Sequence, residues 1–160
     1  MPYKYLIITS FLVLSACGFK LRGDASLPFT TLYIGAGAGS QLQADMKRAV
    51  NQSSVTRVTD KPADAEAQLQ LTSEQKEKII IALNSAGRVR EFQLRYKVNY
   101  QLIDAAKKEL IAPSELILSR NVSYSEAQVL AKEQEEILLF RDMQQDAAQQ
   151  ILRRISLVKR

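Results

Sequence analysis

The alternation of apolar and polar side chains over residues 91–103 constrains the fold more than any other feature. The apolar positions are Phe92, Leu94, Tyr96, Val98, Tyr100 and Leu102, and the polar positions between them are Gln93, Arg95, Lys97, Asn99 and Gln101. Because successive side chains of a strand point to opposite faces, the pattern predicts one long strand with an apolar face on a core and a polar face toward water. At roughly 3.3 Å per residue it would be about 40 Å long. The remaining chain must therefore cover one face of a long sheet.

Other segments also have strand-like patterns rich in β-formers. They lie at residues 31–34, 55–58, 69–81 and 116–124. Polar residues 74–78 interrupt the third segment, so whether one strand continues through Ile79–Ile81 is left open, and Arg120 breaks the alternation of the fourth. Pro113 suits a strand start or an edge strand.

Three turns are predicted from small and polar residues. Asn84-Ser85-Ala86-Gly87 and the segment 104–108 flank the long strand and predict hairpins on both sides of it. The glycine run from Gly35 to Gly39 has neither the GK[ST] ending of a phosphate-binding loop nor the full G-x-G-x-x-G spacing. We interpret it as a flexible turn from a strand to a helix.

Two segments have helical periodicity. Ser40 is a candidate N-cap for a helix that ends near Gln52 and carries apolar residues at Leu42, Met46, Ala49 and Val50. A second helix is predicted over Ser125–Ile155, with the capping-box spacing of Ser125 and Gln128 and an apolar stripe at Phe140, Met143, Ala147, Ile151 and Ile155. At about 1.5 Å per residue it would be roughly 45 Å long, enough to cover the long strand.

These elements predict an α+β fold in two layers. One mostly antiparallel sheet of about four strands carries two helices packed on one face. The molecule should be elongated.

The first residues have the layout of a bacterial secretory signal. Lys4 precedes an apolar run from Leu6 to Leu14, and Ser15 and Ala16 form a small-residue cleavage site. Leu14-Ser15-Ala16-Cys17 resembles a bacterial lipobox, whose cysteine is acylated on its thiol and, after cleavage, on its amine. We expect Cys17 to be the lipid anchor of the mature protein.

The chain is therefore divided into three parts. Residues 1–16 are the cleaved signal peptide, residues 17–30 a lipidated tether, and residues 31–160 a single domain. A domain of this size can bury a sizeable core. Its stability must come from that core, because lipidation consumes the only cysteine.

The composition argues against catalysis, metal sites and cofactors. The chain has no histidine, and no serine has an S-x-x-K or G-x-S-x-G context, so we predict a protein that is not an enzyme. The carboxylates Glu133, Glu135 and Glu136 are interpreted as a solvated helix face. The 22 basic and 17 acidic residues give a formal charge of +5, and export favours an anionic lipid or envelope polymer over nucleic acid, although a merely soluble surface stays open.

Three segments together resemble one known family. After Cys17 the chain reads Gly18-Phe19-Lys20-Leu21-Arg22, the turn is followed by Glu91-Phe92-Gln93-Leu94, and the last helix is approached by Val129-Leu130-Ala131-Lys132-Glu133. On these residues the sequence resembles the LptE (RlpB) family of lipopolysaccharide-assembly lipoproteins, over essentially the whole mature chain.

The resemblance implies a lipoprotein on the periplasmic side of the outer membrane. It would plug and help to assemble the β-barrel LptD, and the pair would deliver lipopolysaccharide to the cell surface. Family members bind lipopolysaccharide through basic residues; Lys132 occupies a matching position, and Arg88 and Arg90 supply the positive charge after the turn. Solvated charges at these positions, and a lipoprotein that binds peptidoglycan or an unrelated envelope protein, remain the alternatives.

Overall fold

The structure is a computed structural model that describes residues 27–52 and 55–159. The predicted signal peptide, Cys17 and most of the tether lie outside the described residues. Within the described part, no helix is both long and apolar enough to cross a membrane.

Five strands form one sheet in the order β2-β1-β3-β4-β5. Its strands are β1 (Thr31–Gly35), β2 (Arg57–Thr59), β3 (Ala67–Leu83), β4 (Val89–Asp104) and β5 (Glu109–Ser123). The three long strands are antiparallel, whereas β1 pairs in parallel with both β2 and β3. The mostly antiparallel α+β fold is confirmed, with five strands instead of about four because the three-residue β2 pairs at one edge.

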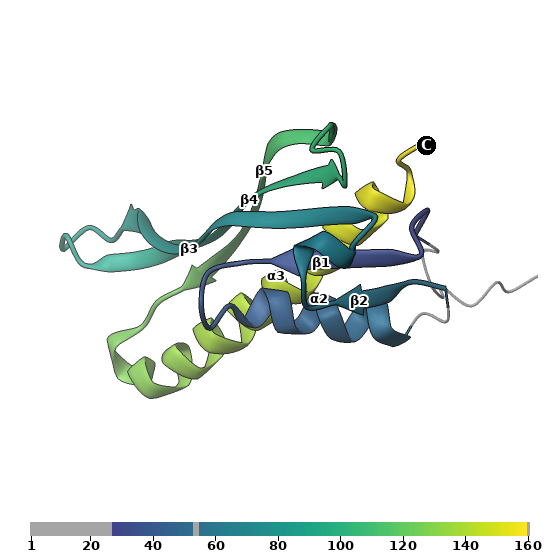
Figure 1. Cartoon of the computed structure of the whole chain (residues 1–160). Helices are drawn as coiled ribbons and strands as arrows, with labels where there is room; N and C mark the ends of the chain where they lie inside the picture. The colour runs from purple at the N-terminus through teal and green to yellow at the C-terminus, as the bar shows by residue number, and fades with distance from the viewer. Residues whose placement is uncertain (1–26, 53–54, 160) are drawn as a thin grey trace, which may run out of the picture.

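Two helices cover one face of this sheet, α2 (Gln41–Gln52) and α3 (Val129–Ser156) (Figure 1). The shorter α2 packs against β1 and β2, and the longer α3 against β4 and β5. The predicted apolar face of β4 is buried beneath them from Leu94 to Leu102, with Tyr96 and Val98 fully buried. The opposite face of the long strands carries no helix (Figure 1).

Strand β3 continues without a break through the polar residues 74–78, so the segment that the sequence leaves open is one strand. A bulge at Thr72 shifts its pairing with β4: Leu71 is opposite Tyr100, and Ser73 is opposite Asn99. The extra residue moves the helix-facing positions from odd numbers before the bulge to even numbers after it. The helix-facing side chains beyond the bulge are Glu74, Lys76, Lys78 and Ile80.

The start of the last helix differs from the sequence prediction. Ser125 has an extended backbone and makes no side-chain capping bond, and a 3-10 turn, η3 (Glu126–Gln128), precedes α3. The helix therefore begins at Val129, and the capping-box interpretation of Ser125 and Gln128 is wrong. The reason is that the Ser125 carbonyl accepts a hydrogen bond from the Gln128 N–H at 3.0 Å. This bond places both residues in the tighter 3-10 turn instead of in the first turn of α3. Ser40, in contrast, caps α2 as predicted, since its Oγ accepts the Gln43 N–H at 3.1 Å.

The β3–β4 hairpin and the first described residues lie at opposite ends of the molecule (Figure 1). Leu32 of β1 is paired with Ala67 at the start of β3, whereas the hairpin follows Leu83 at its end. At roughly 3.3 Å per residue, the strand between them is about 50 Å long. The predicted elongated shape follows from this strand.

Candidate functional site

The β3–β4 hairpin is held in one conformation by Asn84. Its side-chain oxygen accepts the N–H groups of Ala86 and Arg88, each at 3.0 Å, and Gly87 has a φ of +74° that glycine adopts without strain. The predicted turn is confirmed. Because the Asn84 N–H also donates to the Arg88 carbonyl at 2.8 Å, the position of Arg88 at the tip is fixed by the backbone.

Arg88 links this tip to the segment that leads into α3. Its guanidinium lies 3.1 Å from a Glu126 carboxylate oxygen in η3, and the Tyr124 N–H donates to the Arg90 carbonyl at 2.8 Å. Both members of the ion pair are exposed, so the pair orders the tip more than it stabilises the fold. The Arg90 side chain is exposed as well.

Lys132 lies at the same end, on the second turn of α3. Its Nζ donates to the Ser123 hydroxyl at 3.2 Å and to a Glu135 carboxylate oxygen at 2.8 Å, and its side chain is only 19% exposed. Lys132 is therefore a fixed ammonium group between β5 and α3, not a freely solvated charge. The structure brings Arg88, Arg90 and Lys132 to one end of the sheet, which we call the cationic end.

A pocket of about 130 Å³ opens between α3 and the sheet at this end. Its apolar lining comes from β4, from the end of β5 and the residue after it, and from the first turn of α3, namely Phe92, Leu94, Val122, Tyr124 and Val129. The charged lining is Lys78, Lys132, Glu133 and Glu136. We refer to it as the distal pocket.

An ion pair closes one side of the distal pocket. Lys78 of β3 lies 2.6 Å from a Glu136 carboxylate oxygen of α3, and its ammonium group stands 4.4 Å above the centre of the Phe92 ring. Sequence reasoning missed Lys78 and placed Glu136 on a solvated face. The missing signal was the bulge at Thr72. Beyond it the even-numbered side chains of β3 face the helices, and Lys78 is one of them.

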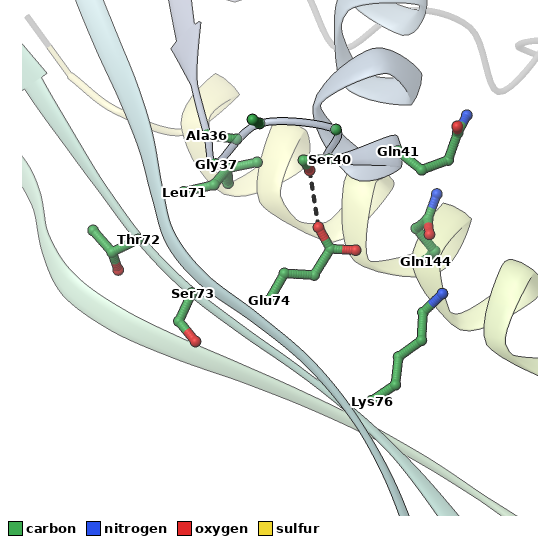
Figure 2. A pocket seen from close by; sticks show the side chains of 12 residues that line it. Ala36, Gly37, Ser40, Gln41, Leu71, Thr72, Ser73, Glu74, Lys76 and Gln144 are labelled. Carbon is green, nitrogen blue, oxygen red and sulfur yellow. Dashed lines mark hydrogen bonds between the residues drawn. The ribbon is translucent and has the colours of Figure 1, made fainter.

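A second pocket, of about 530 Å³, lies where the glycine turn meets β3 and α3 (Figure 2). Here a Glu74 carboxylate accepts hydrogen bonds from Ser40 at 2.8 Å and Tyr96 at 2.7 Å. Burial, reinforced by the bond to Glu74, raises the pKa of the Tyr96 phenol well above its usual value. The tyrosine stays protonated and donates to Glu74, so these groups fix the turn instead of forming an acid–base pair.

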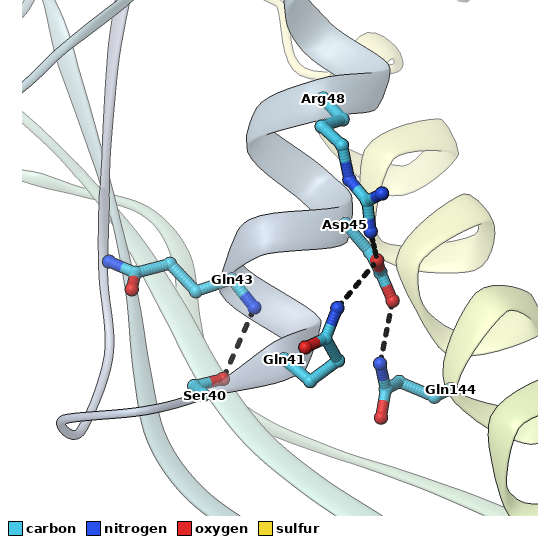
Figure 3. Close-up of polar contacts among 6 residues, drawn as sticks. All are labelled: Ser40, Gln41, Gln43, Asp45, Arg48 and Gln144. Atoms are coloured by element: carbon cyan, nitrogen blue, oxygen red, sulfur yellow. Dashed lines mark hydrogen bonds and ion pairs between the residues drawn. The ribbon is translucent and has the colours of Figure 1, made fainter.

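Polar contacts join the two helices beside this pocket (Figure 3). Asp45 of α2 accepts hydrogen bonds from Gln41 at 3.3 Å and from Gln144 of α3 at 2.6 Å, and it pairs with Arg48. The glycine turn connects β1 to α2 as predicted. Among the described residues, no group of His, Cys, Asp and Glu side chains is arranged to hold a metal ion.

Comparisons with known proteins point to one family. A solution structure of uncharacterized lipoprotein B from Nitrosomonas europaea shares 44% identity and a TM-score of 0.75, over 87% of this chain and 90% of that one. A minor lipoprotein from Acinetobacter baumannii shares 27% identity and a TM-score of 0.65, over 81% and 92% of the two chains. Rare lipoprotein B from Shewanella oneidensis, at 22% identity, has the same fold with a TM-score of 0.69, over 79% and 93%.

The comparison with curated proteins gave no match. The family model described as LptE, lipopolysaccharide-assembly, matches residues 28–155, which include every strand of the sheet, α2 and nearly all of α3. The chain therefore belongs to the LptE family of lipopolysaccharide-assembly lipoproteins, which are associated with the outer membrane.

Proposed function

We propose that this lipoprotein sits as a plug in the lumen of the LptD β-barrel, helps the barrel to assemble, and binds lipopolysaccharide through Arg88, Arg90 and Lys132. Its lipid anchor at Cys17 would hold it on the periplasmic side of the outer membrane. We assign it no catalytic activity. Family membership supports a part in lipopolysaccharide transport with LptD as partner.

The plug role is supported by the sheet face that no helix covers. Polar side chains of β4 line this face and are bonded to the neighbouring strand β3: Lys97 to Glu77 at 2.7 Å, and Gln101 to Gln70 at 2.6 Å. Such pairs make the face rigid and hydrophilic. It therefore suits the lumen of a β-barrel, which is itself polar. The polar character of this uncovered face is the observation that best supports the plug proposal.

Co-purification tests the barrel partner. The lipidated chain, carrying an affinity tag after Arg160, should be extracted in mild detergent together with a stoichiometric outer-membrane barrel. The matched control is a tagged, unrelated outer-membrane lipoprotein, which should not retain that barrel. Recovery of peptidoglycan fragments or another envelope protein, with no barrel, would contradict the proposal.

The lipid role is supported by the geometry of the cationic end. Guanidinium and ammonium groups suit the multivalent phosphates of lipid A. Asn84 fixes Arg88, while Ser123 and Glu135 fix Lys132, so these cations are presented on an ordered surface.

The variant Arg88→Asp, Arg90→Asp, Lys132→Asp should lose most lipopolysaccharide binding while it stays folded and retains the barrel. Binding by the parent should weaken with added salt, because salt screens exposed charges. Pull-down of lipopolysaccharide by the tagged protein measures both effects. The control variant Lys61→Asp, Lys108→Asp, Arg153→Asp makes the same change in net charge at exposed positions away from the hairpin. Equal binding by the two variants would mean that these three cations are not the contact surface.

A further inference from the structure

The distal pocket combines an apolar interior with a charge-balanced rim. Its interior side chains come from Phe92, Leu94 and Val122 on the sheet, and its rim holds two lysines and two glutamates. Lys78 pairs with Glu136 across the rim, and Lys132 is held by Glu135 outside it. A neutral, apolar group is therefore the better occupant of the pocket, whereas anions are better accommodated at the neighbouring arginines.

An exposed apolar flank of α3 extends from this pocket. Leu130, Ile137, Gln144 and Ile151 are spaced by seven residues and lie on one stripe of the helix. Further along α3 this stripe is buried, and Gln144 bonds to Asp45 of α2. The helix α2 begins only at Gln41, and at the distal end the stripe is uncovered: Leu130 is 79% exposed and Ile137 60% exposed.

Strand β3 supplies the opposite flank of the same opening. Ile80, which is 53% exposed, is paired with Phe92 of the pocket lining, and Lys78 precedes it on the helix-facing side. Aliphatic groups thus lie on both sides of an apolar pocket, and the fixed ammonium group of Lys132 is part of its rim. This juxtaposition matches an amphiphile that joins phosphate groups to hydrocarbon chains.

We propose that the distal pocket receives the end of a fatty-acyl chain of the lipid whose phosphates bind Arg88, Arg90 and Lys132. The remaining chain would lie along Leu130, Ile137 and Ile80. This inference rests on the proposed lipopolysaccharide binding and adds a hydrocarbon site to it. The ion pair of Lys78 and Glu136, which carries no net charge, would lie over the chain.

Photocrosslinking of the full chain in growing cells tests the acyl site. The photoreactive residue p-benzoylphenylalanine is placed, one position at a time, at Val129 in the pocket lining, at Ser85 on the hairpin tip and at Leu138. Leu138 is a matched aliphatic position of α3, 49% exposed, and helical periodicity turns it away from the sheet. Ultraviolet light should give a lipopolysaccharide adduct at Val129 and Ser85, and none at Leu138.

The other outcomes separate the acyl site from the proposed function. An adduct at Ser85 without one at Val129 would overturn the acyl site and leave headgroup binding in place. Loss of the adduct at every position would overturn both. A protein adduct at Val129 would identify a polypeptide as the occupant and also overturn the acyl site.

A second probe position guards against a folding artefact at Val129. Leu130 is exposed enough to carry the photoreactive ring without repacking, and it should give the same lipopolysaccharide adduct. In the Val129 probe background, Ile137→Gln should reduce the adduct yield, and Leu138→Gln should leave it unchanged. Equal yields from these two matched substitutions would overturn the assignment of the α3 flank to the acyl chain.

Discussion

Val98→Asp should unfold the protein or reduce its free energy of unfolding by at least about 3 kcal/mol, because it buries a carboxylate without a partner. Val98 lies in the middle of β4, on the face of the sheet that the helices cover, and it is fully buried there. Natural domains have only about 5–15 kcal/mol of stability, so a loss of this size is a large fraction of the total. Tyr96→Asp should act in the same way and would also remove the hydrogen bond to Glu74.

The control is the adjacent residue on the other face of the strand. Lys97→Glu removes the ion pair with Glu77, whose members are 24% and 32% exposed, and we expect a loss of only about 1 kcal/mol. Urea denaturation of the three variants and the parent gives the comparison. Equal midpoints for Val98→Asp and Lys97→Glu would show that the register of β4 is wrong.

Cys17→Ala should abolish lipid anchoring at this position and leave an unlipidated precursor. The expected effect is large because each buried methylene contributes about 0.8 kcal/mol and stable anchoring needs two acyl chains, whereas a lipidated Cys17 would carry three. Mass spectrometry of the native protein and fractionation of the variant measure this prediction.

The control for Cys17→Ala is Cys17→Ser, which keeps a polar group of similar size and should behave in the same way because acylation requires the thiol. An unmodified Cys17 thiol in the native protein would refute the anchor. Gly18 and Phe19, rather than an Asp, follow the cysteine, and by analogy with enteric lipoproteins this favours sorting to the outer membrane. Recovery of the native lipoprotein in inner-membrane fractions would instead refute the outer-membrane location.

The sequence was most informative where one local pattern decides the structure. The alternation in β4 predicted its buried residues, Asn84 to Gly87 predicted the hairpin, and the apolar stripe predicted the buried side of α3 from Phe140 onward. Each of these signals lies within one element. Burial then follows from the period of that element alone.

The remaining features depend on contacts between distant residues. The pairing of Lys78 with Glu136 requires both the bulge in β3 and the packing angle of α3, and neither can be read from local periodicity. The same holds for Lys132, whose bond to Ser123 depends on where β5 ends. Arg120 illustrates the point: it breaks the alternation of β5 and faces the helices, and it pairs with Asp146 of α3 at 2.9 Å. The cations of the candidate site could be named from sequence, but their partners could not.

The bulge at Thr72 also determines where β3 can change in length. Removing this one residue would leave Leu71 opposite Tyr100 and Ser73 opposite Asn99, so both halves of the strand would keep their faces. A deletion elsewhere between Ser73 and Ile80 would turn one half over, because strand side chains alternate with a period of two. If the half that carries Lys78 turned over, Lys78 would point to the open face. A chain shortened by one residue at Thr72 would therefore still present the same side chains to α3.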